Sequence, residues 1–241
     1  MSERLSIHDK EPVQSMSIDS KGAYLTELID AQGKPILFPK SLIGDKIRGG
    51  SHVCLPAFGP DASGELPQHG YGRDVEWDIV TASDGRTVQC EYTQQEGSYA
   101  GLQSRIIYQL TERTDGAVLN TKLFLFNHSE SDMPVSPGFH PYFVVNPRDI
   151  TLNDEQISLT DLEPFQDYGI HESMKLQTFG RTITISSPNL QHFIVWSDSR
   201  ADYLCIEPTL AGSGFNYNQP RSGELLPAGQ SQSFSYTIEW E

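Results

Sequence analysis

The sequence predicts an all-β protein, built as a sandwich of large antiparallel sheets. Three observations lead to this prediction. Apolar residues recur with a period of two, and no amphipathic helix longer than about three turns is evident. Turn-forming residues, among them 15 prolines and 20 glycines, separate the apolar runs at short intervals. No linker or shift in composition divides the 241 residues, so we expect a single domain over residues 1–241.

The clearest strand pair lies in the middle of the chain. Apolar and polar side chains alternate over residues 102–110, and a second such run covers residues 118–126. Asp115 and Gly116 between them predict a hairpin, because glycine accepts the positive φ of a tight turn. Further short strands are expected, in chain order, at residues 24–29, 77–80, 87–92, 181–185, 193–196 and 234–240.

Charge and hydropathy exclude several classes of protein. The formal net charge is −15, and no cluster of lysines and arginines is available to bind phosphate backbones, so nucleic acid is not an expected partner. No apolar run approaches the roughly 20 residues that span a bilayer, so we expect no membrane insertion. The same net charge would repel an anionic substrate, except where arginines reverse the potential locally.

The N-terminus and the cysteines indicate the compartment. The first residues have neither the apolar core nor the cleavage pattern of a signal peptide. Cys54, Cys90 and Cys205 are an odd number and form no Cys-x-x-Cys pair. We therefore expect reduced core cysteines in a cytoplasmic protein.

Three short segments each place a titratable residue among glycines, prolines or aromatic residues. His69 lies in Gln-His-Gly-Tyr-Gly-Arg, His140 in Gly-Phe-His-Pro-Tyr-Phe, and Glu207 in Leu-Cys-Ile-Glu-Pro. His140 follows His69 by 71 residues and Glu207 follows His140 by 67, so only the tertiary fold can unite them. Two histidines and a glutamate in an aromatic cleft would suit proton transfer on and off sugar oxygens.

Each of the three residues also has an ordinary structural interpretation. His69 could lie in a solvated loop. His140 could be a buried imidazole bonded to a backbone carbonyl group. Glu207 could be a surface carboxylate at the end of a strand, although a buried one would have a raised pKa and be a better base near neutral pH. These alternatives stay open from the residues alone.

Two arginines accompany these segments. Arg48 precedes two consecutive glycines, which let a backbone approach a ligand while the guanidinium group reaches it. Arg73 follows the His69 segment and could point into the same pocket. The alternative is an ion pair with Asp74 or Glu76 on a solvated loop.

The order and spacing of these segments resemble the aldose 1-epimerase (galactose mutarotase-like) family, including its glucose-6-phosphate 1-epimerase branch. The resemblance extends over most of the chain. It covers residues 21–28, which resemble the family's opening strand, Arg-Gly-Gly at 48–50, and the segments at residues 66–73, 139–143, 205–208 and 226–230.

This resemblance implies a supersandwich fold and an isomerase that interconverts the α and β anomers of an aldose without a cofactor or a metal. Glu207 matches the general base that takes the proton of the C1 hydroxyl group, and His140 the general acid that protonates the ring oxygen. His69 matches a second histidine on the side of the ring oxygen. Asp167 matches the substrate-binding aspartate. After ring opening, rotation about C1–C2 and reclosure give the other anomer.

The sequence departs from both branches of the family. Galactose-type members carry a Gly-Arg pair where this chain has Gly59 and Pro60. Arg48 and Arg73 resemble arginines that the glucose-6-phosphate branch directs at phosphate, whereas the surroundings of His140 resemble the neutral-sugar branch. We therefore expect a hexose or a hexose 6-phosphate as the partner, and neither the choice between them nor the oligomeric state is indicated.

Three other functions would also use residues of these types. A non-catalytic carbohydrate-binding or regulatory protein on the same sandwich would keep the aromatic residues but tolerate loss of the acid or the base. A cupin-like metal enzyme would need a His-x-His pair, which none of the seven histidines forms. The glycines beside Ser213 lack the Gly-x-Ser-x-Gly frame of a serine hydrolase.

Overall fold

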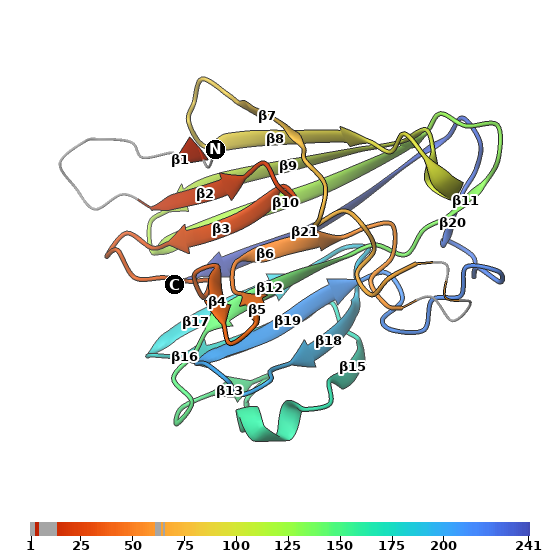
Figure 1. Ribbon diagram of the computed structural model, residues 1–241. Coiled ribbons are helices and arrows are strands. Elements are labelled where there is room, and N and C mark those ends of the chain that lie inside the picture. Colours follow the sequence, from red (N-terminus) through yellow and green to blue (C-terminus); the bar gives the residue numbers. More distant parts are fainter. Residues whose placement is uncertain (1–2, 5–13, 61–63, 65) are drawn as a thin grey trace.

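The computed structural model describes residues 3–4, 14–60, 64 and 66–241. Two large antiparallel sheets dominate this part of the chain (Figure 1). The eight-stranded sheet has the order β1 (Glu3–Arg4), β2 (Ser15–Asp19), β3 (Tyr24–Ile29), β6 (Ser51–Cys54), β12 (Gly138–Val144), β19 (Tyr203–Thr209), β18 (His192–Trp196) and β15 (Gln166–Ile170).

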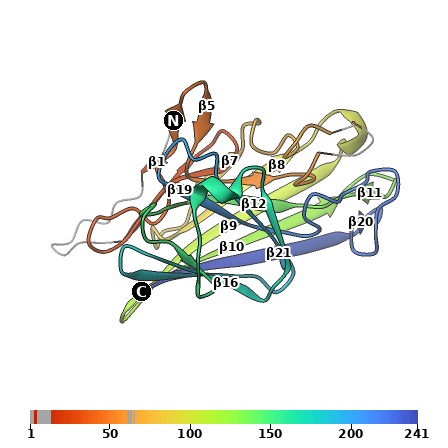
Figure 2. The ribbon, with the colours of Figure 1, turned by 90° about the horizontal axis from the view of Figure 1, so that it is seen from below.

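The second sheet has nine strands, and its longest members are neighbours. In the view of Figure 2, β9, β10 and β21 run together in one layer. The order is β14 (Glu155–Gln156), β13 (Thr151–Leu152), β16 (Ser173–Thr178), β17 (Arg181–Ser186), β21 (Ser231–Trp240), β10 (Gly116–Asn127), β9 (Leu102–Arg113), β8 (Thr87–Thr93) and β7 (Asp78–Thr81).

The remaining elements are short. Two small strand pairs lie outside the large sheets: the hairpin of β4 and β5, and the long-range pair of β11 and β20. The two helices within the described residues are short 3-10 turns, η1 and η2, and no helix there is long and apolar enough to cross a membrane. Their bounds are β4 (Ser41–Ile43), β5 (Lys46–Arg48), β11 (Met133–Pro134), β20 (Leu225–Leu226), η1 (Gly97–Tyr99) and η2 (Leu159–Leu162).

The predicted all-β sandwich is confirmed. The strands expected from the alternating pattern correspond to β3, β7, β8, β9, β10, β17, β18 and β21, with ends displaced by three residues at most. The hairpin of β9 and β10 is also present, but Gly116 is the first residue of β10 and lies outside the turn. A Cβ atom at Gly116 would lie 1.8 Å from the carbonyl oxygen of Trp240, so the close approach of β21 requires this glycine.

Side chains from both large sheets form one apolar core. Phe139 of β12 packs against Tyr236 of β21 with ring centroids 4.7 Å apart. The Tyr236 and Ser51 hydroxyl groups lie 3.3 Å from each other, and the Tyr108 hydroxyl group donates a hydrogen bond to the Ala23 carbonyl oxygen. Buried tyrosines thus keep their hydroxyl groups paired while their rings fill the space between the sheets.

The central strands of the eight-stranded sheet are buried on both faces. Successive side chains of a strand point to opposite faces, so Phe139 and Ile206 enter the core while His140 and Glu207 point away from it. Residues 55–60 and 66–73 and the β4–β5 pair cover that outer face. Polar side chains on these strands are therefore enclosed without being part of the sandwich core.

Replacing Phe139 tests how much the packing of its ring between the two sheets contributes to the stability of the fold. Phe139→Ala removes a fully buried ring, and we expect a loss of about 3–5 kcal/mol in the free energy of unfolding, measured by urea denaturation. The matched control is Phe179→Ala, because Phe179 is 54% exposed and its loss should change stability by no more than about 0.5 kcal/mol. Equal losses in the two variants would contradict this packing.

Candidate active site

The three strands β6, β12 and β19 bring the candidate acid and base groups together. The strand register places His140 opposite His52 of β6, and Tyr142 opposite Cys205 of β19. Glu207 lies two residues after Cys205 and therefore shares its face of the sheet. The convergence of His140 and Glu207, which are 67 residues apart, thus arises from strands that are adjacent in one sheet.

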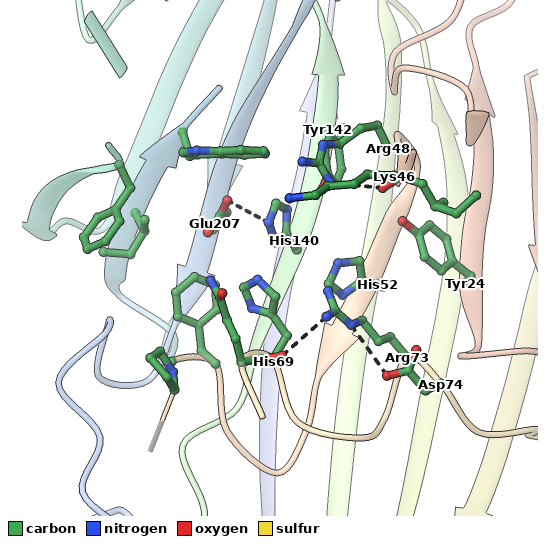
Figure 3. Close-up of a pocket in the computed structure, with 18 of the residues that line it drawn as sticks. Tyr24, Lys46, Arg48, His52, His69, Arg73, Asp74, His140, Tyr142 and Glu207 are labelled. Atoms are coloured by element: carbon green, nitrogen blue, oxygen red, sulfur yellow. Dashed lines mark hydrogen bonds and ion pairs between the residues drawn. The ribbon is translucent and has the colours of Figure 1, made fainter. Parts of the chain in front are cut away.

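His140 and Glu207 form the centre of the site (Figure 3). His140 Nε2 lies 3.2 Å from Glu207 Oε1, and both side chains are buried. The ring N–H is not aimed at this oxygen, because Oε1 has no hydrogen-bond partner among the described residues, and neither has His140 Nδ1. Unsatisfied buried polar atoms are uncommon in folded proteins and are a feature of reactive sites.

Burial shifts the pKa values of this pair in opposite directions. Desolvation disfavours the charged form of each group, so the pKa of Glu207 lies well above its ordinary value of 4.5. The pKa of His140 lies well below 6.5, first because of burial and then because of the nearby His52 and His69. Burial thus favours the state in which both groups are uncharged and the one proton of the pair is on the carboxyl group.

His69 comes from the loop that follows β6. Its backbone N–H donates to the Phe58 carbonyl oxygen at 3.1 Å, and the Leu55 N–H donates to the His69 carbonyl oxygen at 3.2 Å. A Cβ atom at Gly70 would lie 2.0 Å from the Leu55 carbonyl oxygen, so only glycine allows the loop to lie this close to the strand. The His69 ring then lies 5.0 Å from the His140 ring, between centroids. Burial, followed by the charge of Arg73, lowers the pKa of His69 to about 3.

Sequence reasoning missed His52. Its ring centroid lies 4.9 Å from that of His140 and 5.6 Å from that of His69, so three imidazoles share the cavity wall. Burial lowers the pKa of His52 well below 6.5. The available signal was weak: His52 is an ionisable residue between Ser51 and Val53, immediately after the Arg48 segment.

These side chains line a cavity of about 800 Å³. Its wall contains Phe58, Tyr142 and Trp196, which offer flat apolar faces. Such a volume suits a small organic ligand. The complete lining is Lys21, Tyr24, Lys40, Lys46, Ile47, Arg48, His52, Phe58, Gly59, Pro60, Gln68, His69, Arg73, Asp74, His140, Tyr142, Phe165, Ile194, Trp196, Glu207 and Ser213.

The two predicted arginines both reach this cavity but differ in their surroundings. Arg48 donates from Nε and Nη2 to Asp198 Oδ2, each at 3.0 Å, and its guanidinium carbon lies 5.1 Å from the centre of the Trp196 ring. Arg73 makes a 3.8 Å ion pair with Asp74 and a 3.4 Å hydrogen bond to the Gln68 carbonyl oxygen. Arg73 thus makes fewer and longer contacts than Arg48. It lies at the cavity as expected, and the pairing with Asp74 that was the alternative also occurs, within the cavity wall.

Three lysines add to the positive charge at the cavity. Lys21, Lys40 and Lys46 line it together with the two arginines, against the carboxyl groups of Asp74 and Glu207. Asp19 pairs with Lys40 at 3.3 Å and Asp198 with Arg48 at 3.0 Å, and positive groups still outnumber negative ones here, in a chain whose formal net charge is −15. The sequence did not reveal the lysines, because they are spread over 26 residues with no cluster in the chain.

Asp167 is the predicted residue that the structure does not bring to the others. It lies on β15, at the edge of the sheet, and it is absent from the cavity lining. Its Oδ1 accepts hydrogen bonds from His192 Nε2 at 2.7 Å and from the Gly169 N–H at 2.8 Å. Strand β18 separates it from Glu207, so Asp167 has no part in the mechanism proposed below.

The donor atoms of His140, Cys205 and Glu207 could also hold a cation. One ligand atom from each lies within 4.8 Å of the others, and all three side chains are buried. All three cysteines are free thiols and buried, as predicted. Burial and the nearby Glu207 raise the pKa of the Cys205 thiol well above 9, so this thiol is protonated when no cation is bound.

Comparisons with known proteins identify the family of the chain and agree with its fold. The family described as aldose 1-epimerase matches residues 15–169. An Escherichia coli (strain K12) protein, named provisionally as a glucose-6-phosphate 1-epimerase, is 43% identical over 56 residues, which is 22% of this chain and 19% of that protein. The matched part thus spans about a fifth of that relative's length.

Solved structures show the same fold over the whole chain. A protein from Synechocystis sp. PCC 6803 has a TM-score of 0.79 at 23% identity and covers 100% of this chain and 96% of its own. A galactose mutarotase related enzyme from Lactobacillus acidophilus has a TM-score of 0.79 at 13% identity, covering 100% and 97%. The resemblance of the sequence is thus confirmed, and the chain belongs to the aldose 1-epimerase family.

Proposed function

We propose that this protein is a mutarotase that interconverts the α and β anomers of a hexose or a hexose 6-phosphate. The observation that carries the proposal is the contact of 3.2 Å between His140 and Glu207 in the wall of an enclosed cavity. Anomerisation of a hemiacetal changes no oxidation state and requires a base at the C1 hydroxyl group and an acid at the ring oxygen. Correct placement of one such group contributes about 10²–10⁴ in rate.

In the proposed mechanism the proton of the pair moves, in net effect, from His140 to Glu207 by way of the sugar. Glu207 accepts the proton of the C1 hydroxyl group, while His140 gives its proton to the ring oxygen and the C1–O bond breaks. The pair changes from carboxylate and imidazolium to carboxylic acid and neutral imidazole. Rotation about C1–C2 and reversal of both transfers close the ring as the other anomer.

Desolvation explains why this pair would promote ring opening. A buried site disfavours charge, so it favours the uncharged forms of Glu207 and His140. These are the forms present when the ring is open. The cavity therefore stabilises the open-chain complex relative to the closed sugar, and the neutral His69 and His52 can hydrogen-bond to the sugar oxygens without adding charge.

The cations at the cavity support a phosphorylated substrate. Arg73 and Lys46 belong to the lining, and Lys46 is exposed. Asp198 already pairs with Arg48. We therefore assign Arg48 mainly to packing against the Trp196 ring, with a smaller contribution to the positive charge at the cavity. A phosphate group would complement these charges, whereas an uncharged hexose would leave them unused.

Glu207→Gln should test the assignment of the base. The amide keeps the shape of the side chain but cannot accept the proton, so we expect kcat to fall by about 10²–10⁴. Anomer exchange measured by NMR, with the uncatalysed rate subtracted, gives the activity.

The same variant should retain sugar binding, because the cavity and the three histidines are unchanged. Sugar binding measured by calorimetry is therefore the control. Wild-type turnover in Glu207→Gln would falsify the role of Glu207. Binding without anomer exchange in the wild type would instead indicate a carbohydrate-binding protein.

The pH profile should reflect the shared proton. Burial raises the pKa of Glu207, so its proton is retained well above pH 4.5, and burial lowers the pKa of His140, so a second proton binds only well below pH 6.5. We expect kcat/KM, which reports the free enzyme, to be flat through neutral pH and to fall outside both limits. An acid limb centred on the ordinary histidine value would contradict the shared-proton state.

Arg73→Ala should distinguish the two substrate classes. Loss of a charge-assisted hydrogen bond of about 1.5–3 kcal/mol would weaken binding of hexose 6-phosphate roughly 10–100-fold. Binding of the free hexose should change little. The matched control is Arg86→Ala, because the Arg86 side chain has the same 36% exposure but pairs with Glu112 on the nine-stranded sheet. Equal weakening for both sugars would argue against a phosphate at Arg73.

A further inference from the structure

We propose that the cavity also binds a thiophilic divalent cation, of which Zn²⁺ is the example, through His140, Cys205 and Glu207. The cation would act as an inhibitor that excludes the sugar. The binding site follows from the arrangement of the three side chains. Its inhibitory effect rests on the proposed function, because the cation occupies the acid and the base of the mutarotase.

The backbone holds the three donor groups on one face. Cys205 and Glu207 are two residues apart on β19, so both side chains point away from the core. His140 lies on the adjacent strand β12, whose register pairs Tyr142 with Cys205. Because the donors project from paired strands, their separation is fixed by the sheet.

The distances are close to those of a metal centre. The donor atoms of the three residues lie within 4.8 Å of one another, and His140 Nε2 and Glu207 Oε1 are 3.2 Å apart. With bonds of about 2.0–2.3 Å, tetrahedral zinc places its ligand atoms roughly 3.3–3.8 Å apart. Side-chain shifts of about 1 Å or less would therefore complete the coordination.

The donor set selects the class of cation. A thiolate, an imidazole and a carboxylate together favour Zn²⁺ and Co²⁺, whereas Mg²⁺ and Ca²⁺ prefer oxygen ligands alone. The thiol gives up its proton on binding, the His140–Glu207 pair releases the one that it holds, and the two anionic ligands then balance the charge of the cation. Oε1 of Glu207, a buried acceptor with no hydrogen-bond partner in the described chain, would gain one in the cation.

The arrangement also provides an entry path and an open coordination position. His140 and Glu207 line the cavity, whereas Cys205 lies behind them and is fully buried. A cation arriving through the cavity would have three protein ligands and a fourth position open to water, as in many zinc sites. Within residues 14–60 and 66–241, one group of three such donors lies this close together, and it consists of His140, Cys205 and Glu207.

The nearest rival donor group is less suitable. Cys54 Sγ lies 3.4 Å from His69 Nδ1 and 3.8 Å from His52 Nδ1. It has no carboxylate among these contacts, so it lacks the anionic oxygen ligand that Glu207 gives the first group. Cys54 therefore serves as the comparison thiol in the experiment below.

Titration of the full chain with Co²⁺ tests the site directly. Thiolate coordination produces a ligand-to-metal charge-transfer band in the near ultraviolet, and we expect one equivalent of Co²⁺ to generate it in the wild type. Cys205→Ser should remove the band and weaken Zn²⁺ binding by more than the roughly 10–100-fold that loss of an outer-shell partner costs. Cys90→Ser, which changes a buried thiol of the nine-stranded sheet, and Cys54→Ser should retain the band.

The anomer-exchange assay then tests the inhibition. Zn²⁺ should inhibit the wild type and Cys90→Ser in competition with the sugar, and Cys205→Ser should keep its basal activity but resist Zn²⁺ at least tenfold better. If Cys205→Ser fails to fold, as judged by its thermal melt, Cys205→Ala replaces it. No band in the wild type, or a band that survives loss of Cys205, would overturn the proposal. A cobalt band in a protein with no anomerase activity would uphold the metal site and reject the proposed function.

Discussion

The close contact between Glu207 and His140, two ionisable groups removed from water, is the constraint on which the rest of the structure depends. Each group alone would be costly to bury. Together they need only one proton, and the pair is uncharged when that proton is on the carboxyl group. The same contact explains the enclosure of the cavity, the opposed pKa shifts, the acid-base chemistry that we propose, and the affinity that we infer for a thiophilic cation.

The sandwich provides the rigidity that this contact requires. One face of β12 and β19 is packed into the core through Phe139 and Ile206, so the opposite face presents His140 and Glu207 from a backbone with little freedom to adjust. The loop carrying His69 is held against Leu55, where the absence of a side chain at Gly70 permits the approach. The proposed acid and base thus come from strands packed on the core, and the covering loop adds His69 to the cavity.

Electrostatics divides the cavity into two regions. The inner region has three imidazoles with lowered pKa values and a carboxyl group with a raised one, so it is uncharged and suited to the reacting hemiacetal. The outer region carries the arginines and lysines, which reverse the potential of an acidic protein where a substrate enters. A sugar with a phosphate remote from C1 would match both regions.

The sequence by itself determined the strand pattern, the sandwich class, the family and the segments that carry His69, His140, Glu207, Arg48 and Arg73, because period-two alternation and local turn chemistry are encoded in short windows. Only the tertiary structure decided which strands become neighbours. It brought His52 and the dispersed lysines to the cavity, placed Cys205 beside the acid-base pair, paired Arg48 with Asp198, and kept Asp167 at the edge with His192. Such contacts join residues far apart in the chain, so strand order and register set them and no local pattern can.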